Sequence, residues 1–173
     1  MATHDDPAAE PVEDRPFRAV GFLLSQLGLH TAKRFAERLE PLGLHPRQFA
    51  VLRHVSAAEG ESQQAIGEAL GIPASRMVAF IDELEDRGLV ERRPHPTDRR
   101  RHTVYLTPSG RETLERALQI GAEHERDLTA DLDPAEREQL IELLARVAAA
   151  RGLRWGVHPA LTHDKPGWPK PDA

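Results

Sequence analysis

The segment SQQAIGEALGIPASRMVAFIDELEDRGLVERRPHPTDRRRHTVYLTPSG, residues 62–110, decides the fold, because two helical patterns follow each other closely within it. The spacing of its apolar residues predicts one helix over 63–70 and a second over 74–87. The sequence Gly71-Ile72-Pro73 between them indicates a tight turn. The segment therefore begins with a helix-turn-helix. The apolar side of the second helix consists of Met77, Val78, Ile81 and Leu84.

A β-hairpin with a long loop follows the second helix. Residues 89–93 and 102–106 are rich in β-forming side chains, and two prolines and Asp98 interrupt the stretch between them. Helix, turn, helix and hairpin in this order are typical of a winged helix-turn-helix, whose second helix fits the major groove of DNA. All five arginines of the hairpin suit contacts with phosphate: Arg92, Arg93, Arg99, Arg100 and Arg101.

Helices are predicted on both sides of this segment. Apolar residues recur at steps of three and four over 17–39, and Pro41 and Gly43 end that helix. A proline stands at the first position of three further helices, which are expected over 46–58, 108–132 and 134–151. The fold class is therefore mainly α with a small β-hairpin.

The composition excludes several classes of function. The chain has 173 residues, a formal net charge of -5 and no cysteine, so disulfides, thiolate metal sites and thiol redox sensing are excluded. Nine histidines lack the spacing of a metal site, and no catalytic constellation is visible. We expect no metal, no cofactor and no enzymatic activity. Because no apolar run reaches membrane-spanning length, we also expect a cytoplasmic protein.

The segment and its flanks resemble the MarR family of bacterial transcription regulators over about residues 17–151. The resemblance rests on LHPRQFAVL at 44–52, on the L-E-x-x-G-L-V-x-R run at 84–92, on the D-x-R of the hairpin loop and on L-T-x-x-G at 106–110. It implies a winged helix-turn-helix in an obligate homodimer with interlocked terminal helices. The expected regions are a disordered leader (1–16), a dimerisation helix (17–44), a DNA-binding lobe (45–107), dimerisation helices (108–151) and an irregular tail (152–173).

The resemblance implies that the homodimer binds a pseudo-palindromic operator in double-stranded DNA. Arg100 matches the wing arginine that reaches the minor groove, and Asp98 matches the acid that holds the wing arginines in place. Arg99 and Arg101 are expected to contact phosphates. Ser75 and Arg76 are candidates for base contacts, although a phosphate contact suits Arg76 equally well. The candidates outside the wing are Gln64, Pro73, Ala74, Ser75, Arg76 and Ala79.

The resemblance also implies a cleft between the dimerisation helices and the DNA-binding lobe for a small aromatic or anionic effector. Candidate ligand residues are His30, Arg34, Phe49, Arg53 and His124, for each of which simple packing or surface charge is an equal alternative. Candidate interface residues are Phe17, Val20, Leu24, Leu140, Leu144 and Val147.

Two other functions remain open at the level of sequence. A winged-helix module that binds proteins without binding DNA would favour aromatic and apolar anchors in the hairpin, and this hairpin is basic. An RNA-binding protein would favour exposed aromatic residues for stacking on bases, and Tyr105 is the one aromatic residue in the hairpin.

Overall fold

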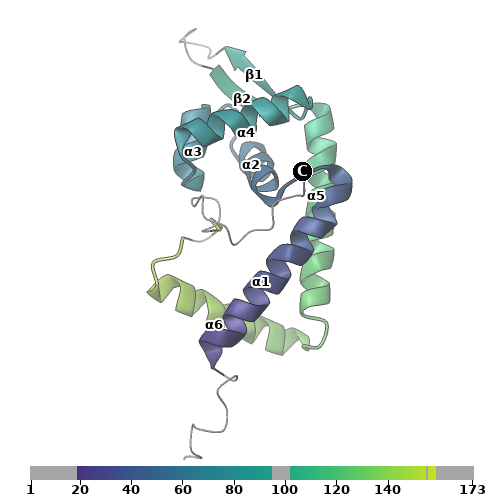
Figure 1. The fold of residues 1–173 in the computed structure, drawn as a ribbon, viewed down its shortest axis with the longest axis vertical. Helices are drawn as coiled ribbons and strands as arrows, with labels where there is room; N and C mark the ends of the chain where they lie inside the picture. The colour runs from purple at the N-terminus through teal and green to yellow at the C-terminus, as the bar shows by residue number, and fades with distance from the viewer. Residues whose placement is uncertain (1–18, 95–101, 155, 159–173) are drawn as a thin grey trace, which may run out of the picture.

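The computed structural model describes residues 19–94, 102–154 and 156–158. It is mainly α with one two-stranded antiparallel hairpin, as the sequence predicts (Figure 1). In chain order the elements are α1 (Val20–Leu39), the 3-10 turn η2 (Glu40–Leu42), α2 (Pro46–Ala57), α3 (Gln63–Leu70), α4 (Ala74–Asp86), β1 (Val90–Pro94), β2 (His102–Leu106), α5 (Pro108–Leu128) and α6 (Pro134–Ala150).

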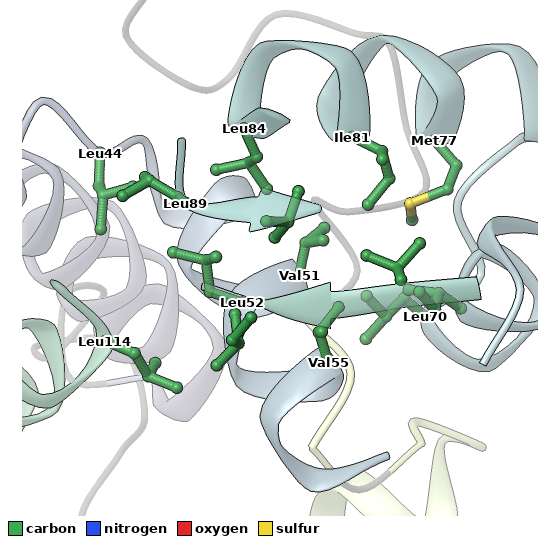
Figure 2. Packing of buried hydrophobic residues seen from close by; sticks show 14 of the residues in the cluster. Leu44, Val51, Leu52, Val55, Leu70, Met77, Ile81, Leu84, Leu89 and Leu114 are labelled. Carbon is green, nitrogen blue, oxygen red and sulfur yellow. The ribbon is translucent and has the colours of Figure 1, made fainter. Parts of the chain in front are cut away.

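The compact lobe consists of α2, α3, α4 and the hairpin. Its buried side chains come from all of these elements and from the start of α5, and Met77, Ile81 and Leu84 of α4 point toward α2 (Figure 2). Val78 was predicted on the apolar side of this helix, but it is 36 % exposed. It follows Met77 directly in the chain, and this step of about 100° around the helix turns it away from the core. The strands pair from Val90↔Leu106 to Pro94↔His102.

The segment before α3 lies beside β2 of the hairpin and is bonded to it. Gly60 donates its N–H to the carbonyl of Val104 (3.1 Å), and Val104 donates its N–H to the carbonyl of Glu61 (2.9 Å). Ser62 forms a bridge with Thr103 and also caps α3 by accepting from the N–H of Ala65. The hairpin is therefore fixed to the start of the helix-turn-helix.

Most helix boundaries agree with the sequence, and the differences are small. The first strand is shifted by one residue, and α4 ends at Asp86. The helix α5 ends at Leu128, four residues before the predicted end, because the 129–132 segment forms a turn. Asp133 follows this turn and caps α6 by accepting from the N–H groups of Ala135 and Glu136.

The helices α1 and α5 run side by side away from the lobe, and α6 lies across their far end (Figure 1). Every residue from 20 to 30 is exposed, and α6 contains no buried residue. Among the described helices, none is long and apolar enough to cross a membrane.

Candidate nucleic-acid interface and ligand pocket

The turn between α3 and α4 exposes the first residues of α4. Gly71 caps α3 with a φ of 68°, a backbone conformation that favours glycine, and Ile72 donates its N–H to the carbonyl of Gly67 at 2.8 Å. Pro73, the residue before α4, is exposed. Of the predicted contact residues on α4, Ala74, Ser75 and Ala79 are also exposed, whereas Arg76 is half-buried.

A hollow of about 530 Å³ separates the start of α4 from α3. Gln64, the predicted contact on α3, is exposed there and donates to Glu68 at 3.0 Å. Predicted contacts from both helices therefore lie around one concave surface. The described lining residues are Gln63, Gln64, Gly67, Glu68, Gly71, Ile72, Pro73, Ala74 and Val78.

Two of the five hairpin arginines form ion pairs within the lobe, and their contacts with phosphate stay predictions. Arg92 forms ion pairs with Asp82 and Glu85 of α4, and its backbone N–H donates to Glu85 at 2.9 Å. Arg93 pairs with Glu91, and its guanidinium lies 4.4 Å from the centre of the Tyr105 ring. Both guanidinium groups thus pair with acidic neighbours, and Arg92 joins the hairpin to α4.

The remaining wing arginines fall outside the described residues. Asp98, Arg99, Arg100 and Arg101 belong to the 95–101 segment, so their roles stay predictions. Phe17 of the predicted dimer interface is likewise outside the described residues.

The Leu106-Thr107-x-x-Gly110 motif joins the hairpin to α5. The Thr107 hydroxyl accepts from the N–H of Gly110 at 3.0 Å and donates to the carbonyl of Gly88 at 2.6 Å. A Cβ atom at Gly110 would lie 1.8 Å from the carbonyl oxygen of Leu89, so no larger residue fits without a shift of the backbone. The motif therefore fixes α5 against the hairpin.

A second cavity, of about 290 Å³, lies between α1 and α2. Phe35 and Phe49 meet edge to face in its wall, with ring centres 5.6 Å apart. Arg47 and Arg53 supply positive charge to the same wall. The described lining residues are Gly28, Thr31, Ala32, Phe35, His45, Pro46, Arg47, Phe49, Ala50, Arg53, Gly156 and His158.

The structure places two of the five predicted ligand residues, Phe49 and Arg53, in this wall. His30 and Arg34 are exposed on α1 and are not among the described lining residues. His124 lies behind the wall, where its Nε2 is 2.7 Å from the Thr31 hydroxyl and its ring centre is 5.5 Å from that of Phe35.

Sequence reasoning missed five polar or chain-terminal contributors to the cavity, which are Thr31, His45, Arg47, Gly156 and His158. The sequence pattern places His45 and Arg47 at the start of α2 and gives no sign that they line a cavity. Gly156 and His158 belong to the tail, for which the sequence pattern gave no position.

Two basic groups in the cavity wall are partly buried. Burial, helped by the positive charge of Arg47, lowers the pKa of His45 below its usual value. Burial and the charge of Arg76 lower the pKa of Arg47. Arg47 in the cavity wall therefore lies close enough to Arg76 of α4 for their positive charges to repel each other.

Among the described residues, no group of three or more histidine, aspartate or glutamate side chains is arranged to hold a metal ion. The described wall of the cavity combines apolar and aromatic side chains with the cations of Arg47 and Arg53.

Known proteins with similar sequences and folds regulate transcription. A putative transcriptional regulatory protein for the hcr operon of Thauera aromatica is 33% identical over 140 residues, which cover 80% of this chain and 84% of that protein. The structure of the transcriptional repressor CouR bound to a 23-mer DNA duplex is 37% identical, with a TM-score of 0.69 and coverage of 81% of this chain and 99% of CouR.

A mutant of Escherichia coli MarR complexed with operator DNA is 28% identical, with a TM-score of 0.65 and coverage of 77% of this chain and 96% of that one. The lobe and these likenesses define a winged helix-turn-helix regulator of transcription. The sequence profile of the MarR family matches residues 42–101, and the chain belongs to that family.

Proposed function

We propose that two copies of this chain form a dimer that binds a pseudo-palindromic operator as a repressor and releases it when a small aromatic anion fills the cavity between α1 and α2. The exposed first turn of α4, beside the hollow against α3, is the observation that carries DNA binding. A helix presented in this way fits the major groove, where serine and arginine side chains can bond base edges.

The exposed apolar surface of the terminal helices supports the dimer. Val20 and Leu24 of α1 are 69 % and 38 % exposed, and Leu140, Leu144 and Val147 of α6 are all at least 39 % exposed. Contiguous apolar surface of this kind marks an interaction site. A second copy is the occupant that we propose, because symmetric pairing of the helices would cover both faces and present two α4 helices to successive half-sites about 34 Å apart.

The cavity supports ligand control. Phe35, Phe49 and Pro46 give the wall aromatic and aliphatic surface. Arg47 and Arg53 add positive charge, and the combination suits an aromatic carboxylate or phenolate. Because α1 belongs to the proposed dimer interface and α2 to the lobe, a ligand between them would change the separation of the two α4 helices. A ligand that prefers another separation lowers the affinity for DNA by linkage.

Fluorescence anisotropy with the DNA upstream of the protein's own gene tests the DNA-binding part. We expect Ser75→Ala and Arg76→Ala to weaken binding, and Arg126→Ala, an exposed arginine near the far end of α5, to bind like the native chain. If Arg76 contacts a base, Arg76→Ala should lose about 1–3 kcal/mol of DNA-binding free energy, and the loss should depend on the DNA sequence. If Arg76 contacts a phosphate, the loss should be the same for all DNA sequences. Equal binding by all four proteins would contradict the interface.

The ligand part is tested by adding hydroxybenzoates to the protein–DNA complex. We expect release of the DNA, and we expect Arg53→Gln to require higher concentrations of ligand. If none of these anions alters DNA binding, the cavity is not the effector site that we propose, while the DNA-binding part of the proposal stands.

A further inference from the structure

The chain that follows α6 returns to the DNA-binding lobe of the same molecule. Gly152, with a φ of 69°, ends α6, and Val157 donates its N–H to the carbonyl of Arg154 at 3.3 Å in a tight turn. Figure 1 shows this segment leaving the end of α6 and rising toward the lobe. The tail segment, defined here as Arg154 with Gly156, Val157 and His158, therefore connects the last helix with the helix-turn-helix.

Two arginines hold the tail segment in place. Arg154 donates through Nη2 to the carbonyl of Ala69 in the last turn of α3, at 2.8 Å. Arg53 of α2 donates through Nη2 to the carbonyl of Gly156, at 3.1 Å. Val157 packs against the buried core of the lobe. Hydrogen bonds and apolar contact thus fix the segment on two helices of the lobe.

Gly156 has a conformation that favours glycine, because its φ is 73°. A Cβ atom at this position would lie 3.8 Å from Nη2 of Arg53, which is an ordinary contact. The carbonyl of Gly156 therefore occupies one N–H of the Arg53 guanidinium in the wall of the cavity.

We propose that the tail segment is a built-in competitor for the cavity, and that an anionic effector displaces the carbonyl of Gly156 from Arg53. This inference rests on the proposed ligand function of the same cavity. A carboxylate forms a charge-assisted and bidentate bond with a guanidinium, which is stronger than the bond from a neutral carbonyl. An anion that binds Arg53 therefore removes one of the bonds that hold the tail segment on the lobe. The tail segment connects α6, in the proposed dimer interface, with α3 of the helix-turn-helix, so this connection becomes looser.

The strength of the competition can be measured as a change in the affinity of the cavity for an anion. If the tail segment is docked in about nine molecules of ten, the apparent affinity of the cavity for an anion is about tenfold below its affinity in molecules without the segment. Removing the segment therefore strengthens anion binding. A tail that merely completed the wall of the cavity would have the opposite effect, because its removal would delete ligand contacts.

Fluorine NMR of 4-fluorobenzoate and its neutral analogue 4-fluorobenzamide tests the proposal on two shortened chains, 1–151 and 1–158. The 1–158 chain is the matched control, because it lacks the rest of the tail but keeps the tail segment. We expect 4-fluorobenzoate to bind 1–151 about tenfold more tightly than 1–158. We expect 4-fluorobenzamide to bind the two chains alike, because it gains no charge-assisted bond to Arg53.

Point variants of the full chain separate the contacts. Arg154→Ala removes the bond to α3 and should strengthen binding of 4-fluorobenzoate, while Arg151→Ala, which removes an exposed cation three residues earlier, should not. Arg53→Gln should abolish the difference between 1–151 and 1–158. Hydrogen exchange should show faster exchange at residues 63–70 in Arg154→Ala and in 1–151 than in the native chain and 1–158.

The outcomes separate this inference from the proposed function. Equal or weaker binding of 4-fluorobenzoate by 1–151 overturns the competition and leaves the ligand cavity standing. Failure of both probes to bind any of the chains overturns the ligand cavity and the competition together.

Discussion

Gly110 shows how a single residue connects the hairpin to the helix that leaves the lobe. Its Cα approaches the backbone of Leu89 so closely that a methyl group would overlap the carbonyl oxygen. Thr107, three residues earlier, accepts from the N–H of Gly110 and donates to Gly88 on the other side of the contact. Thr107 and Gly110 therefore set the position at which α5 leaves the lobe.

We expect Gly110→Ala to destabilise the protein by about 1–3 kcal/mol or more, because the backbone of α5 or of Leu89 must move. Gly121→Ala in the same helix is the matched control, since its methyl group would lie 3.9 Å from the Phe35 ring, an ordinary contact. The control should be neutral or should stabilise the helix by about 0.5–1 kcal/mol. Urea unfolding of both variants checks this, and equal stabilities would contradict the role of Gly110.

His45 acts as the N-cap of α2 in its neutral form. Its Nδ1 accepts from the N–H of Arg47 at 3.2 Å, and its own N–H donates to Gln48 at 3.0 Å. Protonation of Nδ1 removes the acceptor. In agreement, burial and the charge of Arg47 lower the pKa of His45, and burial likewise lowers the pKa of His124.

Because the pKa values of His45 and His124 are lower in the folded protein, both histidines stabilise the fold above about pH 6.5, their pKa in the unfolded chain. This stabilisation is lost as the pH falls through the pKa of the folded state. We expect the free energy of unfolding to decrease between pH 7.5 and 5.5. His45→Asn keeps a side-chain acceptor at the cap and removes its titration, so the decrease should be smaller. Urea unfolding at both pH values checks this, and an unchanged decrease in the variant would exclude His45 as a cause.

At the scale of elements, sequence predicted most of the lobe because its signals are local. Ser62, Pro46 and Gly71 set helix ends through their own backbone or side-chain chemistry, and α3 begins and ends where the pattern places it. The ion pairs of Arg92 and Arg93 could not be predicted, because a charge pattern along the chain does not show that Asp82, Glu85 and Glu91 lie against them.

The cavity was harder to predict because its wall comes from three distant parts of the chain. Phe49 and Arg53 lie on one face of α2, so helical spacing brought them together. No periodicity relates α2 to Gly156 or His158, whose place depends on where α6 ends and how the tail turns back.

The roles of Arg99 and Arg100 in the hairpin loop, the wing of the fold, are still predictions. Arg100→Ala should weaken operator binding by about 1–3 kcal/mol, mostly at A·T-rich flanks, because an arginine in a narrow minor groove gains from its negative potential. Arg99→Ala should weaken binding to all sequences alike and reduce the salt slope by about one per subunit. Salt titrations on two duplexes that differ at the flanks distinguish these results, and unchanged binding by Arg100→Ala would refute its assignment.

At the scale of the whole molecule, the distribution of buried and exposed apolar residues divides the chain into two functional parts. The lobe buries its apolar side chains within one chain, whereas the first half of α1 and most of α6 expose theirs. Such an arrangement fits a chain whose lobe folds on itself and whose terminal helices are completed by a partner.

We expect Leu144→Glu to dissociate the proposed dimer, because one unpaired carboxylate per chain would be buried between the copies. Gln139→Glu adds the same charge to an exposed position of α6 about one quarter-turn from the apolar face, so it should leave the dimer intact. Analytical ultracentrifugation checks both variants. A native chain that sediments as a monomer at micromolar concentration would contradict the dimer before any variant is made.

The most direct test of the central claim is the mass of the complex with DNA, measured by size-exclusion chromatography with light scattering. The protein is mixed with a duplex that contains one inverted repeat from the region upstream of its gene. The proposed function predicts two 19.3 kDa chains on each duplex and no stable complex with a duplex of scrambled sequence. A single chain per duplex, or equal binding to the scrambled duplex, would contradict the dimeric, operator-specific regulator.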